Sequence, residues 1–148
     1  MFVDDWPSIT WSVLDYDRQP KAGFYALQTA MQPILPSIRA SLPDRLDGQR
    51  WVYTSADKLL ISLWVVNDTL NAYPDALLRW RIGDGEDQVV MSDVVRASVR
   101  ADESRSVNSL RPSHLTQGSY RLSVELSDAE GQLLGQNSFE FAMVVEQQ

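Results

Sequence analysis

Apolar and polar residues alternate in several short runs between residues 50 and 148. Leu78, Trp80 and Ile82 alternate with arginines, and every second residue of the run 120–126 is apolar. Successive side chains of a β-strand point to opposite faces, so this alternation predicts strands with one buried and one solvent-exposed face. The full set of predicted extended runs is 51–53, 59–67, 77–82, 88–95, 97–99, 120–126 and 132–145.

The spacing of these runs indicates a fold class. Turn-forming sequences separate them, for example at residues 83–87 and 128–131. About seven strands at intervals of roughly 8–12 residues are typical of an immunoglobulin-like β-sandwich. The chain has no cysteine, which excludes the core disulfide of antibody domains. We therefore predict a mainly β chain, with an immunoglobulin-like β-sandwich at residues 45–148.

The first 44 residues follow a different pattern. Residues 1–17 are irregular and rich in aromatic side chains. After them, three apolar residues recur at spacings of three and four, namely Phe24, Leu27 and Met31. This spacing places side chains on one face of an α-helix, and Pro20 suits its first turn. We predict one helix at residues 20–32, whose apolar face needs another surface to pack on.

Composition limits the partners. The formal net charge is −7, so nucleic acid is not expected as a partner, because phosphate binding depends on clustered Lys and Arg. No stretch approaches the roughly 20 apolar residues that cross a membrane, so no membrane contact is expected. The start of the chain lacks the basic and apolar segments of a secretory signal. The compartment stays open, with the cytoplasm favoured, because a fragment carries no signal information. His114 is the only histidine and lies in a polar run that predicts an exposed loop, so a multi-histidine zinc site is excluded.

Acidic residues are the remaining candidates for chemistry. Retaining glycoside hydrolases use two carboxyl groups about 5–5.5 Å apart. Asp4 and Asp5 are adjacent and would point to opposite sides of a strand, so capping a turn is the simpler role for them. Asp84, Glu86 and Asp87 crowd one turn and offer oxygen ligands to calcium, but their spacing is not that of an EF-hand loop. A solvated turn is the simpler interpretation, and we predict no metal site and no cofactor.

The N-terminal segment resembles a known enzyme family. The residues that carry the resemblance are 2–16 (FVDDWPSITWSVLDY), 18–27 (RQPKAGFYAL) and 33–35 (PIL). In order and spacing they are similar to the end of the catalytic barrel in glycoside hydrolase family 2, in its β-mannosidase and exo-β-glucosaminidase branch. Members carry stretches close to Asn-Asp-x-Trp-Pro, Ser-Trp-Ser, Asp-Tyr, Pro-Lys and Tyr-Tyr-Ala-Leu. The later residues resemble the immunoglobulin-like domains that follow this barrel, including the strand end at 65–68.

The resemblance implies roles for particular residues. Residues 1–44 would form the last strand–helix unit of a (β/α)8 barrel, whose active site lies at the C-terminal ends of the strands. Trp6 would be an apolar platform for substrate, and Asp4 would help to shape the same rim. The sequence departs from the family at Val3, where the usual residue is Asn.

The resemblance also implies where catalysis resides. The family's two catalytic glutamates come from the fourth and seventh barrel strands, which would precede residue 1. We therefore expect a non-catalytic C-terminal piece of a retaining β-glycosidase that is β-mannosidase-like and hydrolyses terminal β-linked sugars. Its partners would be the rest of that enzyme and, in the intact protein, carbohydrate.

Two other functions stay open. A carbohydrate-binding sandwich would use surface aromatic residues, and the candidates are Trp51, Tyr53, Trp64, Tyr73 and Trp80. Tyr73 is expected at the surface because it lies in a turn-like sequence, whereas Trp80 shares the apolar face of its strand and is expected in the core. A protein-interaction domain would contact no sugar. The apolar face of the helix at 20–32 could also let the isolated chain self-associate.

Overall fold

The computed structural model describes residues 3–4, 12–43, 46–48 and 50–145. It divides into two compact units, Met1–Gln32 and Pro33–Gln148, which are described one at a time. The sequence placed a boundary after residue 44. In the structure the strand that begins at Ile34 pairs within the second unit, so the division between compact units comes before this strand.

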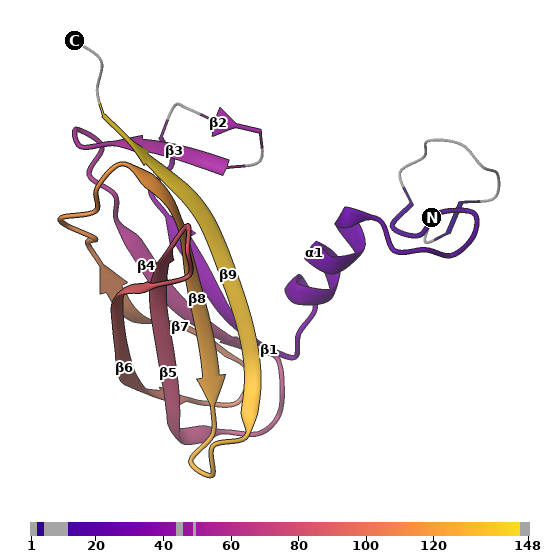
Figure 1. Ribbon diagram of the computed structural model, residues 1–148. Coiled ribbons are helices and arrows are strands. Elements are labelled where there is room, and N and C mark those ends of the chain that lie inside the picture. The colour runs from indigo at the N-terminus through magenta and orange to yellow at the C-terminus, as the bar shows by residue number, and fades with distance from the viewer. Residues whose placement is uncertain (1–2, 5–11, 44–45, 49, 146–148) are drawn as a thin grey trace. The chain divides into compact units, whose positions relative to one another are not determined.

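The second unit is a two-sheet sandwich (Figure 1). Its strands among the described residues are β1 Ile34–Ala40, β2 Leu46–Asp47, β3 Arg50–Thr54, β4 Ile61–Asn67, β5 Tyr73–Asp84, β6 Val89–Val99, β7 Glu103–Leu110, β8 Gly118–Ser127 and β9 Leu133–Val144. One sheet has the order β1-β4-β7 and the other the order β2-β3-β9-β8-β5-β6. The described strand pairs are antiparallel, apart from β3 and β9, which run parallel. The predicted mainly β, immunoglobulin-like fold class is confirmed.

Alternate residues of the central strands fill the space between the sheets. Burial alternates without interruption from Ile61 to Asn67 on β4. The side chains that are at most 1% exposed include Leu63, Val65, Leu78, Ile82, Leu122, Val124, Leu126 and Phe141. Each large apolar side chain of this kind stabilises the fold by about 1.5–3 kcal/mol when buried. The alternation seen in the sequence therefore marks the inward face of each central strand.

Asn67 is a fully buried polar residue at the end of β4, with 0% of its surface exposed. Its Nδ2 donates to the carbonyl oxygens of Asn71 (2.8 Å) and Arg100 (2.7 Å). Its Oδ1 accepts from the backbone N–H of Thr69 (3.1 Å). Because buried polar groups need hydrogen-bond partners, this side chain ties the end of β4 to two loops.

The sequence did not predict β1 or β7. β1 contains Pro36, which has no N–H to donate, and such a residue is tolerated because β1 is an edge strand of its sheet. β7 is mostly polar and has only Leu110 fully buried. Both strands form against opposite edges of β4, so pairing with β4 stabilises them where their own patterns are weak.

The first unit contains the helix α1, Ala22–Ala30. It is shorter than the predicted 20–32 and lies within that range. Phe24 and Leu27 are half-buried, as expected for the apolar face, while Tyr25 and Met31 are 57% and 71% exposed. No helix in the described part of the chain is long and apolar enough to cross a membrane.

Candidate functional site

Two short bridges bring Asp4 beside a later part of the first unit. Val3 forms a parallel bridge with Leu14, and Leu14 forms an antiparallel bridge with Pro20. The backbone N–H of Asp4 donates to the carbonyl oxygen of Leu14 (3.1 Å). The stretches around Val3, Leu14 and Pro20, which are separated in sequence, therefore lie side by side next to Asp4.

A tight turn reverses the chain between these stretches. The carboxylate of Asp15 accepts from the backbone N–H of Gln19 (2.7 Å), and the N–H of Arg18 donates to the carbonyl oxygen of Asp15 (3.0 Å). Arg18 has a φ of 64°, in the left-handed region that tight turns use. After the turn, the N–H of Lys21 donates to the carbonyl oxygen of Val13 (2.9 Å). This geometry sets Lys21 opposite Asp4.

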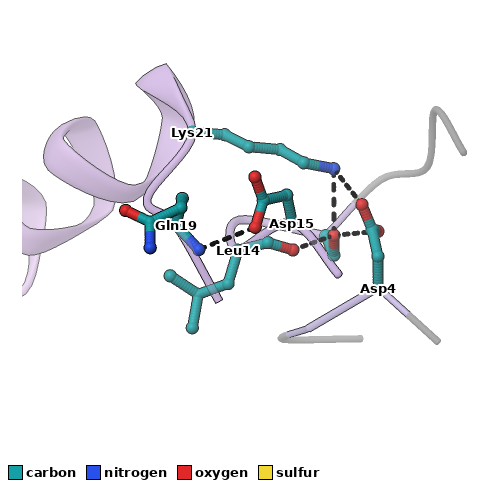
Figure 2. A network of polar contacts seen from close by, with 6 residues as sticks. Asp4, Leu14, Asp15, Gln19 and Lys21 are labelled. Atoms are coloured by element: carbon teal, nitrogen blue, oxygen red, sulfur yellow. Dashed lines mark hydrogen bonds and ion pairs between the residues drawn. The ribbon is translucent and has the colours of Figure 1, made fainter. Parts of the chain in front are cut away.

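Asp4 is the centre of a polar network (Figure 2). Lys21 Nζ lies 2.6 Å from Asp4 Oδ2 and 3.1 Å from Ser12 Oγ. The Ser12 hydroxyl bonds to Asp4 Oδ1 and lies 2.7 Å from the carbonyl oxygen of Leu14. The Asp4 side chain is 1% exposed, whereas that of Lys21 is 31% exposed. The carboxylate is thus enclosed and the ammonium group partly reaches solvent.

The network determines what Asp4 can do chemically. The hydrogen bond from Lys21, followed by the one from Ser12, lowers the pKa of Asp4 below its usual value. The carboxyl group is therefore ionised near neutral pH and has no proton to give to a leaving group. Both of its oxygens are engaged with protein partners. This arrangement suits a carboxylate that holds the backbone in place.

Two residues of the sequence-based hypothesis lie outside the described residues. These are Trp6, the expected sugar platform, and Asp5, the neighbour of Asp4 that was considered with it as a carboxyl pair.

The acidic turn at residues 84–87 is held together by hydrogen bonds from its own backbone. Asp84 Oδ1 accepts from the backbone N–H groups of Glu86 (3.0 Å) and Gln88 (2.9 Å), which is ordinary turn chemistry. Beside it lies a depression of about 410 Å³ lined by Arg50, Asp84, Asp87, Ser119, Arg121 and Glu140. Arg121 is paired with Glu140 (2.5 Å), and Arg50 with Ser119 (2.6 Å). Across the described ranges, no three acidic, His or Cys side chains are grouped as metal ligands.

The five aromatic candidates for a carbohydrate surface take different positions. Tyr53 and Trp80 are buried in the core (1% and 5% exposed). Trp51 and Tyr73 are half-buried and pack against the same core. Tyr73, which was expected at the surface, is thus only partly exposed; it begins β5 opposite Val99 and its ring packs against the core. Trp64 differs from the other four, since its neighbours along β4 point into the core and it points outward.

Residues 60–144 match the family described as the Mannosidase Ig/CBM-like domain. The chain belongs to this family. Among curated relatives, β-mannosidase B of Thermothelomyces thermophilus is 32% identical over 108 residues, which cover 70% of this chain and 12% of that protein. β-Mannosidase B of Aspergillus terreus is 34% identical over 68 residues, which cover 44% of this chain and 7% of that protein. This member of the Mannosidase Ig/CBM-like domain family thus spans only a small part of the length of these relatives.

Solved structures show the same fold. The exo-chitosanase CsxA of Amycolatopsis orientalis superimposes with a TM-score of 0.71 at 17% identity, covering 96% of this chain and 15% of that one. The β-D-mannosidase of Dictyoglomus thermophilum superimposes with a TM-score of 0.57 at 18% identity, covering 95% and 15%. Together with the family match, these similarities confirm the expected likeness to the C-terminal region of glycoside hydrolase family 2 enzymes.

The sequence pointed to Asp4 but not to its hydrogen-bond partners Ser12 and Lys21. Ser12 and Lys21 are eight and seventeen residues away in the chain, so no local pattern connects them with Asp4. A signal was nevertheless present, because both residues lie in stretches of the family resemblance, Ser12 in the Ser-Trp-Ser stretch and Lys21 in the Pro-Lys stretch. The exposed position of His114, by contrast, follows the sequence prediction.

Proposed function

We propose that this chain is a non-catalytic part of a β-mannosidase-type retaining glycosidase, in which the sandwich is a structural domain. The match of residues 60–144 to the Mannosidase Ig/CBM-like domain family carries the proposal. Curated β-mannosidases are similar to parts of this chain over 68 and 108 residues, which make up 7% and 12% of their length. The state of Asp4 supports the same proposal, because an ionised carboxylate bound by Lys21 and Ser12 is unsuited to the acid step of glycoside hydrolysis.

We further propose that residues 1–32, the part of the predicted unit that precedes β1, form the last strand–helix unit of a (β/α)8 barrel, and that Asp4 is a positioning residue there. Its enclosed carboxylate ties the strand at Val3 and Asp4 to the segment that leads into α1. In this arrangement Trp6 would contact the sugar, and Asp4 would act through the backbone that leads to Trp6. The barrel and any accessory domains of the enzyme would be the partners of this chain.

The absence of catalysis can be tested directly on the purified chain. It should release no p-nitrophenol from p-nitrophenyl β-D-mannoside or p-nitrophenyl β-D-glucosaminide, because the two catalytic glutamates would come from other barrel strands. Hydrolysis that follows the chain through two different chromatographic separations would contradict the proposal.

The coding sequence immediately upstream of Met1 provides a second test. It should continue in the same reading frame and encode a barrel with one glutamate at the end of its fourth strand and one at the end of its seventh. A stop codon in frame directly upstream would refute the assignment of residues 1–32 to such a barrel.

Acid should disrupt the Asp4 network. Because the pKa of Asp4 is lowered in the folded chain, its stabilising contribution is complete above the ordinary Asp value of about 3.9 and is lost as pH falls through the lowered value. NMR signals of Ser12 and Lys21 should move in that acid range, and Asp4→Asn should show the altered signals already at neutral pH. Asp17→Asn, at an exposed turn position, is the matched control and should leave both signals in place. Wild-type signals in Asp4→Asn would show that the network does not need the charge.

A further inference from the structure

Trp64 lies at the centre of the outward face of the three-stranded sheet. It is on β4, the middle strand, and its neighbours Leu63 and Val65 are fully buried. Side chains alternate across a strand, so the indole ring points away from the core. Its register partners on both adjacent strands are serines, Ser37 on β1 and Ser106 on β7. Small hydroxyl side chains therefore flank the ring in both register positions, and the Trp64 side chain as a whole is half-buried.

A groove adjoins this ring at one end of β1 and β4. It has a volume of about 530 Å³ and is lined by residues that include Arg39, Ser41, Leu42, Leu60, Ser62 and Trp64. Pockets that bind small molecules commonly have volumes of about 300–1,000 Å³. No carboxylate lines the groove, although the chain as a whole carries a net charge of −7. The groove thus combines an aromatic ring, aliphatic side chains, hydroxyls and one guanidinium group.

The fold leaves several polar groups of this groove unused. Within the described part of the chain, neither the Arg39 guanidinium nor the Ser62 hydroxyl makes a hydrogen bond or an ion pair. The Nε1–H of Trp64 is shielded from solvent and has no hydrogen-bond partner there either. A shielded donor without an acceptor is unfavourable. Ser41 differs, because its hydroxyl donates to the carbonyl oxygen of Lys58 (3.3 Å) and accepts from the N–H of Leu60 (3.0 Å).

We propose that this groove binds a short, neutral pyranose oligosaccharide. The flat indole face suits the C–H face of a sugar ring, and the unused donors at Arg39 and Ser62 suit its hydroxyl oxygens. The negative net charge of the chain disfavours an anionic sugar. The groove is confined to one end of two strands, which suits a few sugar rings rather than the roughly 800 Å² per partner of a standard protein interface. The site belongs to the sandwich alone and does not depend on the proposed barrel.

An NMR titration of the full chain tests this site. The probes are β-1,4-mannotriose and cellotriose, with the α-linked maltotriose for comparison. The chain has five tryptophans, and Trp64→Phe assigns one indole N–H signal to Trp64. We expect saturable shifts of that signal and of the Ser62 and Arg39 amides with at least one β-linked probe. No saturable shift with any probe, or shifts confined to the depression around Arg50 and Asp84, would overturn the proposal.

Variants separate ring stacking from general effects on the fold. Trp64→Ala should weaken binding by at least about tenfold, which corresponds to 1.4 kcal/mol. Ser62→Phe should do the same by filling the groove, and it carries the test if Trp64→Ala does not fold. The matched control is Trp51→Phe, which alters a half-buried ring packed against the core and should leave binding unchanged. Unaltered binding in both groove variants would refute the site, and this outcome is independent of whether the chain hydrolyses a glycoside.

Discussion

Tyr53 shows how the surroundings of one side chain decide its chemistry. The residue is 1% exposed, and its hydroxyl donates to the carbonyl oxygen of Ser41 (2.7 Å). Its ring meets Phe141 edge to face, with 6.0 Å between the ring centroids. Burial, aided by the nearby Asp57 carboxylate, raises the pKa of Tyr53 to about 12. Charging this phenol is therefore opposed by the folded state.

The folded chain should lose stability in alkali through Tyr53. Its pKa is raised above the ordinary tyrosine value of about 10, so its contribution is complete below that pH and is lost as pH rises through about 12. Phenolate absorbance should show one of the five tyrosines titrating late. Tyr53→Phe should remove this late step, while Tyr25→Phe, at an exposed position on α1, should retain it. A late step that persists in Tyr53→Phe would assign it to another residue.

At the scale of elements, β1 and β9 approach each other closely at Gly135. A Cβ at this position would overlap the carbonyl oxygen of Ile34 and lie 3.0 Å from Pro36 Cδ. Two residues further along β9, Asn137 Nδ2 donates to the carbonyl oxygen of Pro36 (3.0 Å). The close contact between β1 and β9 is therefore possible because Gly135 has no side chain, and the hydrogen bond from Asn137 supports it.

Gly135→Ala should destabilise the sandwich. The atoms in the way belong to backbone and proline, so the strands must move apart, and overpacking of this kind costs about 1–3 kcal/mol. Urea unfolding should show this loss. Gly85→Ala is the matched control, because its nearest neighbouring atom would be 3.9 Å away and the expected change is within about 0.5 kcal/mol. Equal stability of the two variants would argue against the close approach of β1 and β9.

The edge strand β6 has a charged residue that opposes pairing with a strand of another molecule. Val89, Val90 and Val94 are 55%, 46% and 47% exposed on this end strand of the larger sheet. Asp93 is the register partner of the buried Trp80, so it lies on the core-facing side and is nevertheless exposed. A charge at such a position hinders the addition of another strand to the edge.

Asp93→Val should therefore make the chain self-associate. The substitution leaves the edge of β6 with a continuous apolar surface and free backbone groups, and sedimentation velocity should show a concentration-dependent increase in mass. The matched control is Glu125→Val on the central strand β8, which adds the same side chain where both backbone edges are already paired. Association of the control to the same extent would mean that surface hydrophobicity, and not the strand edge, is responsible.

At the scale of the whole molecule, the core belongs to one unit. All of the buried apolar residues that form the described core lie between Ile34 and Phe141. Compact units with their own core generally fold alone. The second unit therefore has what it needs for cooperative folding without residues 1–32.

A chain of residues 33–148 should unfold cooperatively, at a Tm close to that of the sandwich in the full chain. Differential scanning calorimetry of both lengths provides the comparison. Leu122→Ala, which removes a fully buried side chain, should lower the Tm of both lengths by a similar amount because it costs about 2–5 kcal/mol in either one. A shortened chain without a cooperative transition would show that the first unit is needed for the fold.

The sequence by itself determined the central strands of the sandwich and the existence of α1. Alternating burial on β4, β5 and β8 is a local property, because period-two hydrophobicity assigns each side chain to a face before any contact is known. The family resemblance was also a property of the sequence alone, and it pointed to Asp4 and to a β-mannosidase-like relative.

The tertiary structure decided what local patterns do not contain. β1 and β7 form because each pairs with one edge of β4. Their own sequences are weak strand formers, since β1 contains a proline and β7 is mostly polar. Asp4 acquires its partners only when the turn at Arg18 returns the chain to it. Tyr73 lies in a turn-like sequence and nevertheless packs against the core, so its local sequence did not determine its burial. Which face of a strand meets the other sheet is a property of the pairing of layers, and it turned the half-buried ring of Trp64 away from the core.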